Sequence, residues 1–152
     1  LLGEQVLYHD TDSIVYVSRP GGYEVPTGNM LGEWEDELHG EHMVNVWTSG
    51  GPKCYAYQLS DGSTTCKVKG FNLKRSDTAK LIHYNSMKGL VEDRYHQNVE
   101  TKIRTTQTII KRVKTHALLK TEEQSKELRV QYTKGNVVVH RNNMVETLPY
   151  GY

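Results

Sequence analysis

The chain has 152 residues, of which 36% are hydrophobic and 24% are charged, and its formal net charge is +1. This length allows one domain, or two small subdomains, around a modest core. No apolar run reaches the roughly 18 residues that a membrane-spanning helix needs, so no membrane partner is expected. The only two cysteines, Cys54 and Cys66, favour a reducing, intracellular compartment over a disulfide framework.

The small net charge conceals an uneven distribution. Residues 1–50 contain nine acids and one base, a net charge of −8, whereas residues 51–152 contain eighteen bases and nine acids, a net charge of +9. Within the second part, residues 67–114 contain twelve Lys or Arg and four acids. An acidic part that collects cations, joined to a basic part that follows a polyanion, suits phosphodiester chemistry. Charged runs also form ordinary solvated faces, and the composition leaves both interpretations open.

The first predicted element is a β-hairpin. The apolar runs 5–7 and 14–17 flank the segment Tyr-His-Asp-Thr-Asp-Ser at 8–13, a short polar turn between strand-like runs. The turn brings Asp10 and Asp12 close together, and two close carboxylates raise each other's proton affinity unless a cation lies between them. Hard oxygen ligands of this kind suit Mg²⁺ (or Mn²⁺), which keeps several waters and is shared with substrate phosphates. The hairpin is therefore a candidate site for metal-assisted phosphoryl chemistry.

Two other interpretations of this turn are possible. Asp and Ser favour turns by bonding their own backbone, so the segment can be a plain solvated turn. A calcium loop fits less well, because the EF-hand pattern requires an oxygen ligand where Ile14 stands and a glycine where Val15 stands.

Further short elements are expected along the first half. A turn-rich segment covers 18–26, and 29–38 predicts a short acidic helix with an Asn N-cap and an apolar face. Residues 43–47 alternate like a strand, which the Ser-Gly-Gly-Pro at 49–52 interrupts. The Asp-Gly pair at 61–62, between strand-like flanks, then predicts a second hairpin, with strands over 54–59 and 64–71.

The second half has a different texture. Ser76 or Asp77 can cap a helix that runs to about residue 93, with a partial apolar stripe. A basic, Thr-rich stretch follows at 103–114. We expect a loop or short turn at 122–124, strands at 128–132 and 136–140, and an extended aromatic tail at 147–152.

A zinc site can also be drawn from the sequence. It would use His39, His42, Cys54 and Cys66. The two cysteines lie twelve residues apart in different predicted strands, without the tight Cys-x-x-Cys spacing of structural zinc sites. Zinc is therefore the weaker metal hypothesis.

Three segments in this order resemble a known family. The segments are 8–13 (Tyr-x-Asp-Thr-Asp-Ser), 51–57 (Gly-Pro-Lys-Cys-Tyr-Ala-Tyr) and 66–70 (Cys-Lys-Val-Lys-Gly). Together they resemble the C-terminal region of family B DNA polymerases, in the protein-primed branch. The Leu-Gly-x-Trp at 31–34 and the Leu-Pro-Tyr-Gly-Tyr tail at 148–152 are most similar to polymerases of Polinton (Maverick) elements and related DNA viruses. The resemblance covers nearly the whole chain.

The resemblance implies a role for each matching residue. Asp12 would be the direct metal ligand, and Asp10 would lie beside it and assist. Lys53 and Tyr55 match the Lys-x-Tyr motif that grips the primer terminus, and Lys67 would contact the duplex backbone. Lys69 would contact the backbone as well, and the remaining motif residues would shape the hairpin: Tyr8, Thr11 and Ser13.

The implied fold class is α+β. Residues 1–75 would form the C-terminal part of the palm, with antiparallel hairpins and a short helix, and residues 76–152 a mixed α/β thumb that holds duplex DNA. The implied enzyme is a DNA-directed DNA polymerase, a nucleotidyltransferase of DNA replication. Its partners would be primer-template DNA, deoxynucleoside triphosphates and a terminal priming protein, at a nuclear or viral replication site.

The start of the chain bears on this interpretation. The first residue is not Met, the N-terminus has none of the regions of a signal peptide, and the best motif begins only one short strand later. We expect a C-terminal piece of a longer polymerase. No earlier Asp-bearing palm motif, Lys-rich fingers motif or set of exonuclease carboxylates is recognisable, so we expect the 152 residues alone not to polymerise. The alternative is a non-catalytic nucleic-acid-binding module derived from such an enzyme.

Overall fold

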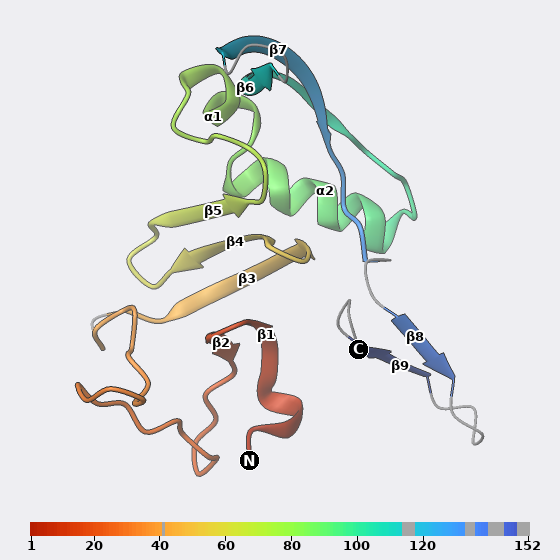
Figure 1. Cartoon of the computed structure of the whole chain (residues 1–152). Coiled ribbons are helices and arrows are strands. Elements are labelled where there is room, and N and C mark those ends of the chain that lie inside the picture. The colour runs from red at the N-terminus through yellow and green to blue at the C-terminus, as the bar shows by residue number, and fades with distance from the viewer. Residues whose placement is uncertain (41, 114–117, 133–135, 140–144, 149–152) are drawn as a thin grey trace. The chain divides into compact units, whose positions relative to one another are not determined.

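The computed structural model describes residues 1–40, 42–113, 118–132, 136–139 and 145–148. The contacts divide the chain into two compact units, Leu1–Met43 and Val44–Tyr152. Antiparallel sheets and separate helices make the fold class α+β, as the sequence predicts (Figure 1). The predicted palm–thumb boundary between residues 75 and 76 falls inside the second unit and stays a prediction.

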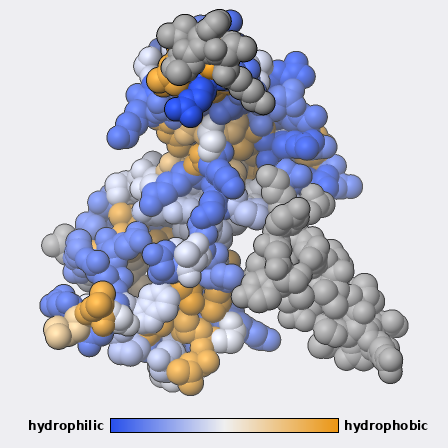
Figure 2. Space-filling view, in the orientation of Figure 1, coloured by the Kyte–Doolittle hydropathy of each residue, from blue (hydrophilic) through white to orange (hydrophobic). Residues whose placement is uncertain are grey.

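The face of the molecule seen in Figure 2 is mostly polar. Hydrophilic residues cover most of the face seen in Figure 2, and hydrophobic residues are visible between them in smaller groups. None of the helices in the described part of the chain is both long and apolar enough to cross a membrane.

The first unit contains the predicted N-terminal hairpin. After a short 3-10 helix, Gly3–Gln5, strands β1 (Val6–Asp10) and β2 (Ser13–Tyr16) pair antiparallel. Two bonds close the open end of the hairpin, because the Gln5 side-chain amide donates to the Val17 carbonyl and the Val17 N–H donates to the Gln5 carbonyl, both at 2.8 Å. None of the described side chains in this unit is fully buried.

The acidic helix predicted over 29–38 is wrong. This segment consists of turns and bends, with an isolated bridge between Thr27 and Trp34. Polar side chains bind the backbone donors that a helix would use: the Glu33 carboxylate accepts the Met30 N–H at 2.8 Å, and Asp36 accepts the N–H groups of residues 38 and 40. Such local bonds compete with helix formation, and Gly32, at φ +92°, has a left-handed backbone that interrupts a helix.

The second unit begins with a three-stranded antiparallel sheet of β3 (Val44–Gly51), β4 (Cys54–Leu59) and β5 (Thr64–Val68), in that order. The hairpin predicted around residues 61–62 is confirmed. Strand β3 continues through Gly50 and Gly51, which were expected to interrupt it. Close neighbours leave no room for a side chain at either position, so glycine is required there. A Cβ atom on Gly50 would lie 3.1 Å from the Met87 sulfur, and one on Gly51 would collide with the Gln131 carbonyl oxygen.

The single helix predicted over 76–93 is also wrong, because two helices form there. Helix α1 (Ser76–Leu81) and helix α2 (Tyr84–His96) are separated by extended residues Ile82 and His83. The break lets Ile82, which is 1% exposed, enter the core, and Ser86 accepts the His83 N–H at 2.9 Å to restart the helix. The capping interaction predicted for Ser76 or Asp77 is absent from α1, whose N-cap is Arg75.

Helix α2 packs on one face of the β3–β4–β5 sheet (Figure 1). Burial alternates along β4, so Cys54 and Ala56 face the helix. The Cys54 sulfur lies 4.0 Å from the sulfur of Met87, which is completely buried. The buried hydrophobic residues form one cluster: Cys54, Ala56, Val68, Ile82, Tyr84, Met87, Leu90 and Leu128.

A long two-stranded ribbon follows, made of β6 (Ile103–Val113) and β7 (Leu118–Leu128). The loop or turn expected at 122–124 is therefore wrong, because these residues pair with β6 in continuous register. The strand expected at 128–132 is also wrong, since β7 ends at Leu128. Lys126 ties the ribbon to the end of β5 by donating to the Gly70 carbonyl at 2.7 Å.

The last described elements are strands β8 (Asn136–Val139) and β9 (Val145–Leu148), which pair antiparallel. Strand β8 confirms most of the strand predicted over 136–140. The turn expected at 134–135 and the end of the aromatic tail, 149–152, lie outside the described residues.

Candidate metal-binding hairpin and nucleic-acid-binding strands

The aspartate hairpin has the tightest common turn length. Asp10 ends β1 and pairs with Ser13, the first residue of β2, so Thr11 and Asp12 form a two-residue loop. The Ser13 hydroxyl donates to the Asp10 carbonyl at 3.1 Å, and the Thr11 hydroxyl donates to the Asp10 carboxylate at 3.3 Å. Asp10 is half-buried and Asp12 is exposed, so the turn presents carboxylate oxygens to solvent. Tyr8, opposite Val15, completes the motif on β1.

Thr11 adopts an unfavourable backbone conformation. Its φ angle is +54°, in the left-handed region, where a β-branched side chain crowds the backbone. Gly, Asn or Asp would occupy a position like this at lower cost. Strain of this kind persists where the surrounding structure imposes it and is common at functional sites. A positive φ at the first loop position is what a two-residue hairpin turn requires, so the hairpin differs from a plain solvated turn in the residue at position 11 and in its acidic side chains, not in its backbone.

The chemistry of the turn fits a hard divalent cation in part. Carboxylate oxygens are ligands that Mg²⁺ prefers, and Mg²⁺ takes its remaining ligands from water and substrate phosphates. Among the residues that the structure describes, no three His, Cys, Asp or Glu side chains gather into a set that could hold a metal ion. The hairpin can thus offer two carboxylates to a metal ion, and its role as a metal site stays a prediction.

The predicted primer-binding lysine also lies in a two-residue turn. Gly51 pairs with Cys54, which leaves Pro52 and Lys53 as the loop between β3 and β4. Lys53 has a φ of +56°, and a proline followed by a residue of positive φ is the pattern of a type II turn, in which glycine is preferred at the second position. The Lys69 N–H donates to the Lys53 carbonyl at 2.8 Å and connects this turn to the end of β5.

A later segment of the chain, residues 131–132, hydrogen-bonds to the end of β3 just before the Lys53 turn. The Gln131 N–H donates to the Gly50 carbonyl at 3.0 Å, and the Tyr132 hydroxyl donates to the Ser49 carbonyl at 2.9 Å. Gly51 lies against the Gln131 backbone and has a φ of +121°, so only glycine fits this position without strain.

The strand register groups the four residues predicted to bind DNA. Tyr55 on β4 pairs with Lys67 on β5, and the Lys67 amino group lies 5.9 Å from the centre of the Tyr55 ring, within cation–π distance. Lys53 and Lys69 are joined through the backbone one step further along the same pair of strands. The sheet thus brings Lys53, Tyr55, Lys67 and Lys69 to one end of β4 and β5.

Two further aromatic side chains, Trp47 and Tyr57, which were not predicted to belong to this group, lie beside Tyr55. The Trp47 ring stacks on Tyr55 with centroids 4.8 Å apart and on Tyr57 at 6.0 Å. The three rings share the sheet face opposite α2, since Trp47 pairs with Tyr57 and residues two apart on a strand share a face. That alternation is visible in the sequence and could have identified the group. Arrays of aromatic rings with adjacent cations are typical of surfaces that bind nucleic-acid bases.

Among the residues that the structure describes, the two cysteines join no set of three or more His, Cys, Asp or Glu side chains that could hold a metal ion. Burial raises the pKa of the Cys54 thiol from 9.0 to about 11, with a further contribution from Cys66, and burial raises the pKa of the Cys66 thiol to about 11 as well. The zinc hypothesis gains nothing from the described residues.

Many cations of the predicted duplex-binding region contact carboxylates. The ion pairs are Lys88–Glu92, Lys102–Glu100, Lys102–Glu127, Arg104–Glu127, Lys111–Glu122, Lys120–Glu122 and Arg129–Glu100. Pairs as exposed as these contribute little stability, so an incoming phosphate can exchange with the carboxylates. Several cations are therefore already paired on the folded surface, while the net excess of positive charge is unchanged.

Comparison with protein-family models, curated proteins and solved structures gave no match for this chain. The assignment of a function thus depends on the residues and their geometry. The aspartate hairpin belongs to the first unit and the lysine–tyrosine strands to the second.

Proposed function

We propose that the chain is the C-terminal palm and thumb portion of a protein-primed family B DNA polymerase of the Polinton or related viral type. In this proposal Asp12 and Asp10 hold Mg²⁺, Lys53 and Tyr55 hold the primer end, and Lys67 and Lys69 contact the duplex backbone. The observation that carries the proposal is the strained two-residue turn, which keeps two carboxylates at the tip of a hairpin where a plain turn would favour a different residue at position 11.

The chemistry of nucleotide addition gives each group a task. Bound divalent metal ions would stabilise charge on the attacking 3′-oxygen and on the departing pyrophosphate. The protein contributes mainly positioning and electrostatic stabilisation in phosphoryl transfer. A cation at Lys53 would fix the terminal primer phosphate, and Tyr55, steadied by Trp47 and Lys67, would hold the sugar or base beside it.

A manganese titration of the 152-residue chain tests the metal site. Mn²⁺ is paramagnetic and should broaden the amide resonances of residues 10–13 selectively, because the ion binds the Asp10 and Asp12 carboxylates. The Asp12→Asn variant should lose this broadening. Asp61→Asn is the matched control, because Asp61 occupies the other hairpin turn and accepts the Ser63 N–H at 2.8 Å. Broadening that survives in Asp12→Asn, or that never occurs at 10–13, would exclude the proposed metal site.

A second candidate function is a non-catalytic nucleic-acid-binding module. It is favoured by the absence of a three-ligand metal set among the described residues, together with the cationic and aromatic group on β4 and β5. The two functions differ in the effect of Asp12→Ala in the complete polymerase. Loss of nucleotide incorporation with duplex binding intact supports the enzyme, whereas unchanged function supports the binding module.

A further inference from the structure

A cavity of about 220 Å³ lies in the second unit, between the end of α2, the loop that follows it and the segment after β7. Its lining combines guanidinium, carboxylate and neutral groups: Arg94, Glu100, Arg129, Val130, Gln131 and Tyr132. Neither the aspartate hairpin nor the Lys-x-Tyr motif contributes a residue to this cavity. The hydrogen bonds of Gln131 and Tyr132 to the end of β3 anchor one wall next to the Pro52–Lys53 turn.

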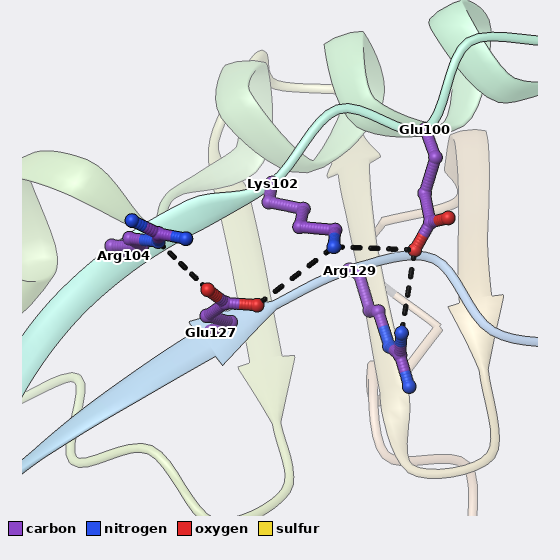
Figure 3. Close-up of polar contacts among 5 residues, drawn as sticks. All are labelled: Glu100, Lys102, Arg104, Glu127 and Arg129. Atoms are coloured by element: carbon purple, nitrogen blue, oxygen red, sulfur yellow. Dashed lines mark hydrogen bonds and ion pairs between the residues drawn. The ribbon is translucent and has the colours of Figure 1, made fainter.

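The carboxylate of the cavity belongs to a chain of alternating charges. Figure 3 shows Arg104, Glu127, Lys102, Glu100 and Arg129 linked in that order. The link between Arg104 and Glu127 is short, 2.7 Å, whereas Glu100 lies 3.4 Å from Arg129 and 4.0 Å from Lys102. The Arg129 and Glu100 side chains are 48% and 46% exposed. The Arg129–Glu100 contact is thus long, solvated and easily exchanged.

The second guanidinium of the cavity belongs to Arg94, and its hydrogen-bond partner is a neutral group that does not offset its charge. Arg94 donates to the neutral Asn98 side-chain oxygen at 3.2 Å. Arg94 and Tyr132 both line the cavity. Burial, with a smaller contribution from Cys54, raises the pKa of the Tyr132 hydroxyl, and the positive charge of Arg94 lowers it in part. Two guanidinium groups therefore line the cavity with one carboxylate, and Lys102 shares that carboxylate.

We propose that this cavity is a phosphate subsite in which Arg94 and Arg129 bind the oxygens of one backbone phosphate of a nucleic-acid strand. Guanidinium groups suit this ligand because their planar donors match the geometry of phosphate oxygens. Glu100 acts as the internal anion that a phosphate displaces from Arg129. The inference rests on the proposed function only in that the chain binds nucleic acid, and it adds a contact beyond the Lys-x-Tyr strands.

Binding of a short fluorescent DNA duplex to the full 152-residue chain tests the subsite. Arg94→Gln and Arg129→Gln should each weaken binding about tenfold, the usual effect of losing a charge-assisted hydrogen bond. Arg19→Gln, at an exposed arginine of the first unit, removes the same charge outside the predicted duplex-binding region and should change affinity less than twofold. Glu100→Gln should tighten binding more than Glu123→Gln, its control on β7. Thermal unfolding of each variant verifies that it is folded.

The outcomes separate the two proposals. If the unmodified chain binds duplex but the cavity variants behave like Arg19→Gln, the subsite is refuted while the proposed function stands. If the unmodified chain binds no duplex, the proposed function fails, and the subsite fails with it as a site for a nucleic-acid strand. A parallel titration with inorganic pyrophosphate distinguishes the source of the phosphate. Pyrophosphate binding that depends on Arg94 and Arg129, with duplex binding indifferent to both, would reassign the cavity to a free phosphate and overturn the proposal.

Discussion

At the residue scale, the most constrained position is Gly51. It combines a φ of +121° with a backbone contact to Gln131 that leaves no space for a methyl group. Gly62, in the turn between β4 and β5, also has a positive φ, +86°, but nothing lies within 4 Å of the position where its Cβ would be. A comparison of the two positions therefore distinguishes the effect of backbone strain alone from the effect of strain combined with steric collision.

Replacing Gly51 by Ala should destabilise the protein by about 3 kcal/mol or more, because strain and collision add. Replacing Gly62 by Ala should cost only the strain, about 1 kcal/mol. Urea unfolding of both variants measures the difference. Equal losses would mean that the Gln131 segment does not hold the end of β3 in solution.

The two thiols predict a dependence of stability on pH. Burial keeps both neutral, with pKa values of about 11 in the folded chain against 9.0 ordinarily. Between pH 9 and 11 the unfolded chain loses these protons while the folded chain retains them, so the free energy of unfolding should fall as pH rises through that window. Below pH 9 the thiols should contribute no slope.

The double variant Cys54→Ala and Cys66→Ala checks this effect. It should show a shallower decline of the unfolding free energy between pH 9 and 11 than the original chain, whatever its absolute stability. Tyr16, whose pKa is raised by burial, is shared by both proteins and cancels in the comparison, whereas Cys54 contributes to the raised pKa of Tyr132 and this contribution is removed with the thiol. An unchanged slope would show that the thiols are solvated in the folded state.

At the element scale, the pairing of β4 with β5 turns separate sequence motifs into one surface. Residues 53 and 55 are joined to residues 69 and 67 by register and by the bond between Lys69 and Lys53. Cations grouped in this way should neutralise neighbouring phosphates and release their counterions.

Duplex affinity should fall linearly with salt on a log–log scale, by about 0.9 for each phosphate contacted. A triple variant with glutamine in place of Lys53, Lys67 and Lys69 should show a smaller slope. The matched control replaces three lysines that pair with carboxylates, Lys88, Lys111 and Lys120, and removes the same formal charge. Equal changes in slope would show that general charge, and not this surface, attracts the duplex.

The elements differed in how well the sequence predicted them. Both short hairpins followed from alternating residues around tight turns, since the information lies within a few residues. The break between α1 and α2 depends on packing in the core, but the sequence contains a sign of it. Ile82 and Met87 are five residues apart, a spacing that no single helical face repeats. The grouping of the candidate residues on β4 and β5 followed from the second hairpin, and their role stays a prediction. The cavity at Arg94 and Arg129 depends on contacts between distant segments that periodicity does not encode.

At the scale of the whole molecule, the boundary between the two units also separates the acidic part of the chain from the basic part that contains the hydrophobic core. Residues 44–50 contain no charged side chain, so the first unit carries the net charge of −8 and the second the net charge of +9. The buried hydrophobic cluster lies entirely in the second unit. A two-stranded hairpin without buried side chains is marginally stable by itself.

Hydrogen exchange should therefore be uneven along the chain. Amides of β1 and β2 should exchange with little protection, whereas amides of β4, which lie between two strands and under α2, should approach the protection set by global unfolding. The β4–β5 hairpin is the internal control, because it is also an antiparallel hairpin but packs on the core. Strong protection in β1 would reveal stabilising contacts that its low burial does not account for.

The bond between Tyr132 and Ser49 joins residues 83 positions apart. During synthesis, β3, β4 and β5 can emerge from the ribosome and pair long before residue 132 exists, yet the far end of β3 stays without its cover until then. A nascent chain would thus acquire its lysine-bearing turn in two stages, first by local pairing and later by the arrival of the covering segment. A ribosome that pauses before this segment would hold the sheet in an incompletely closed form, with the backbone of Gly50 open to other chains.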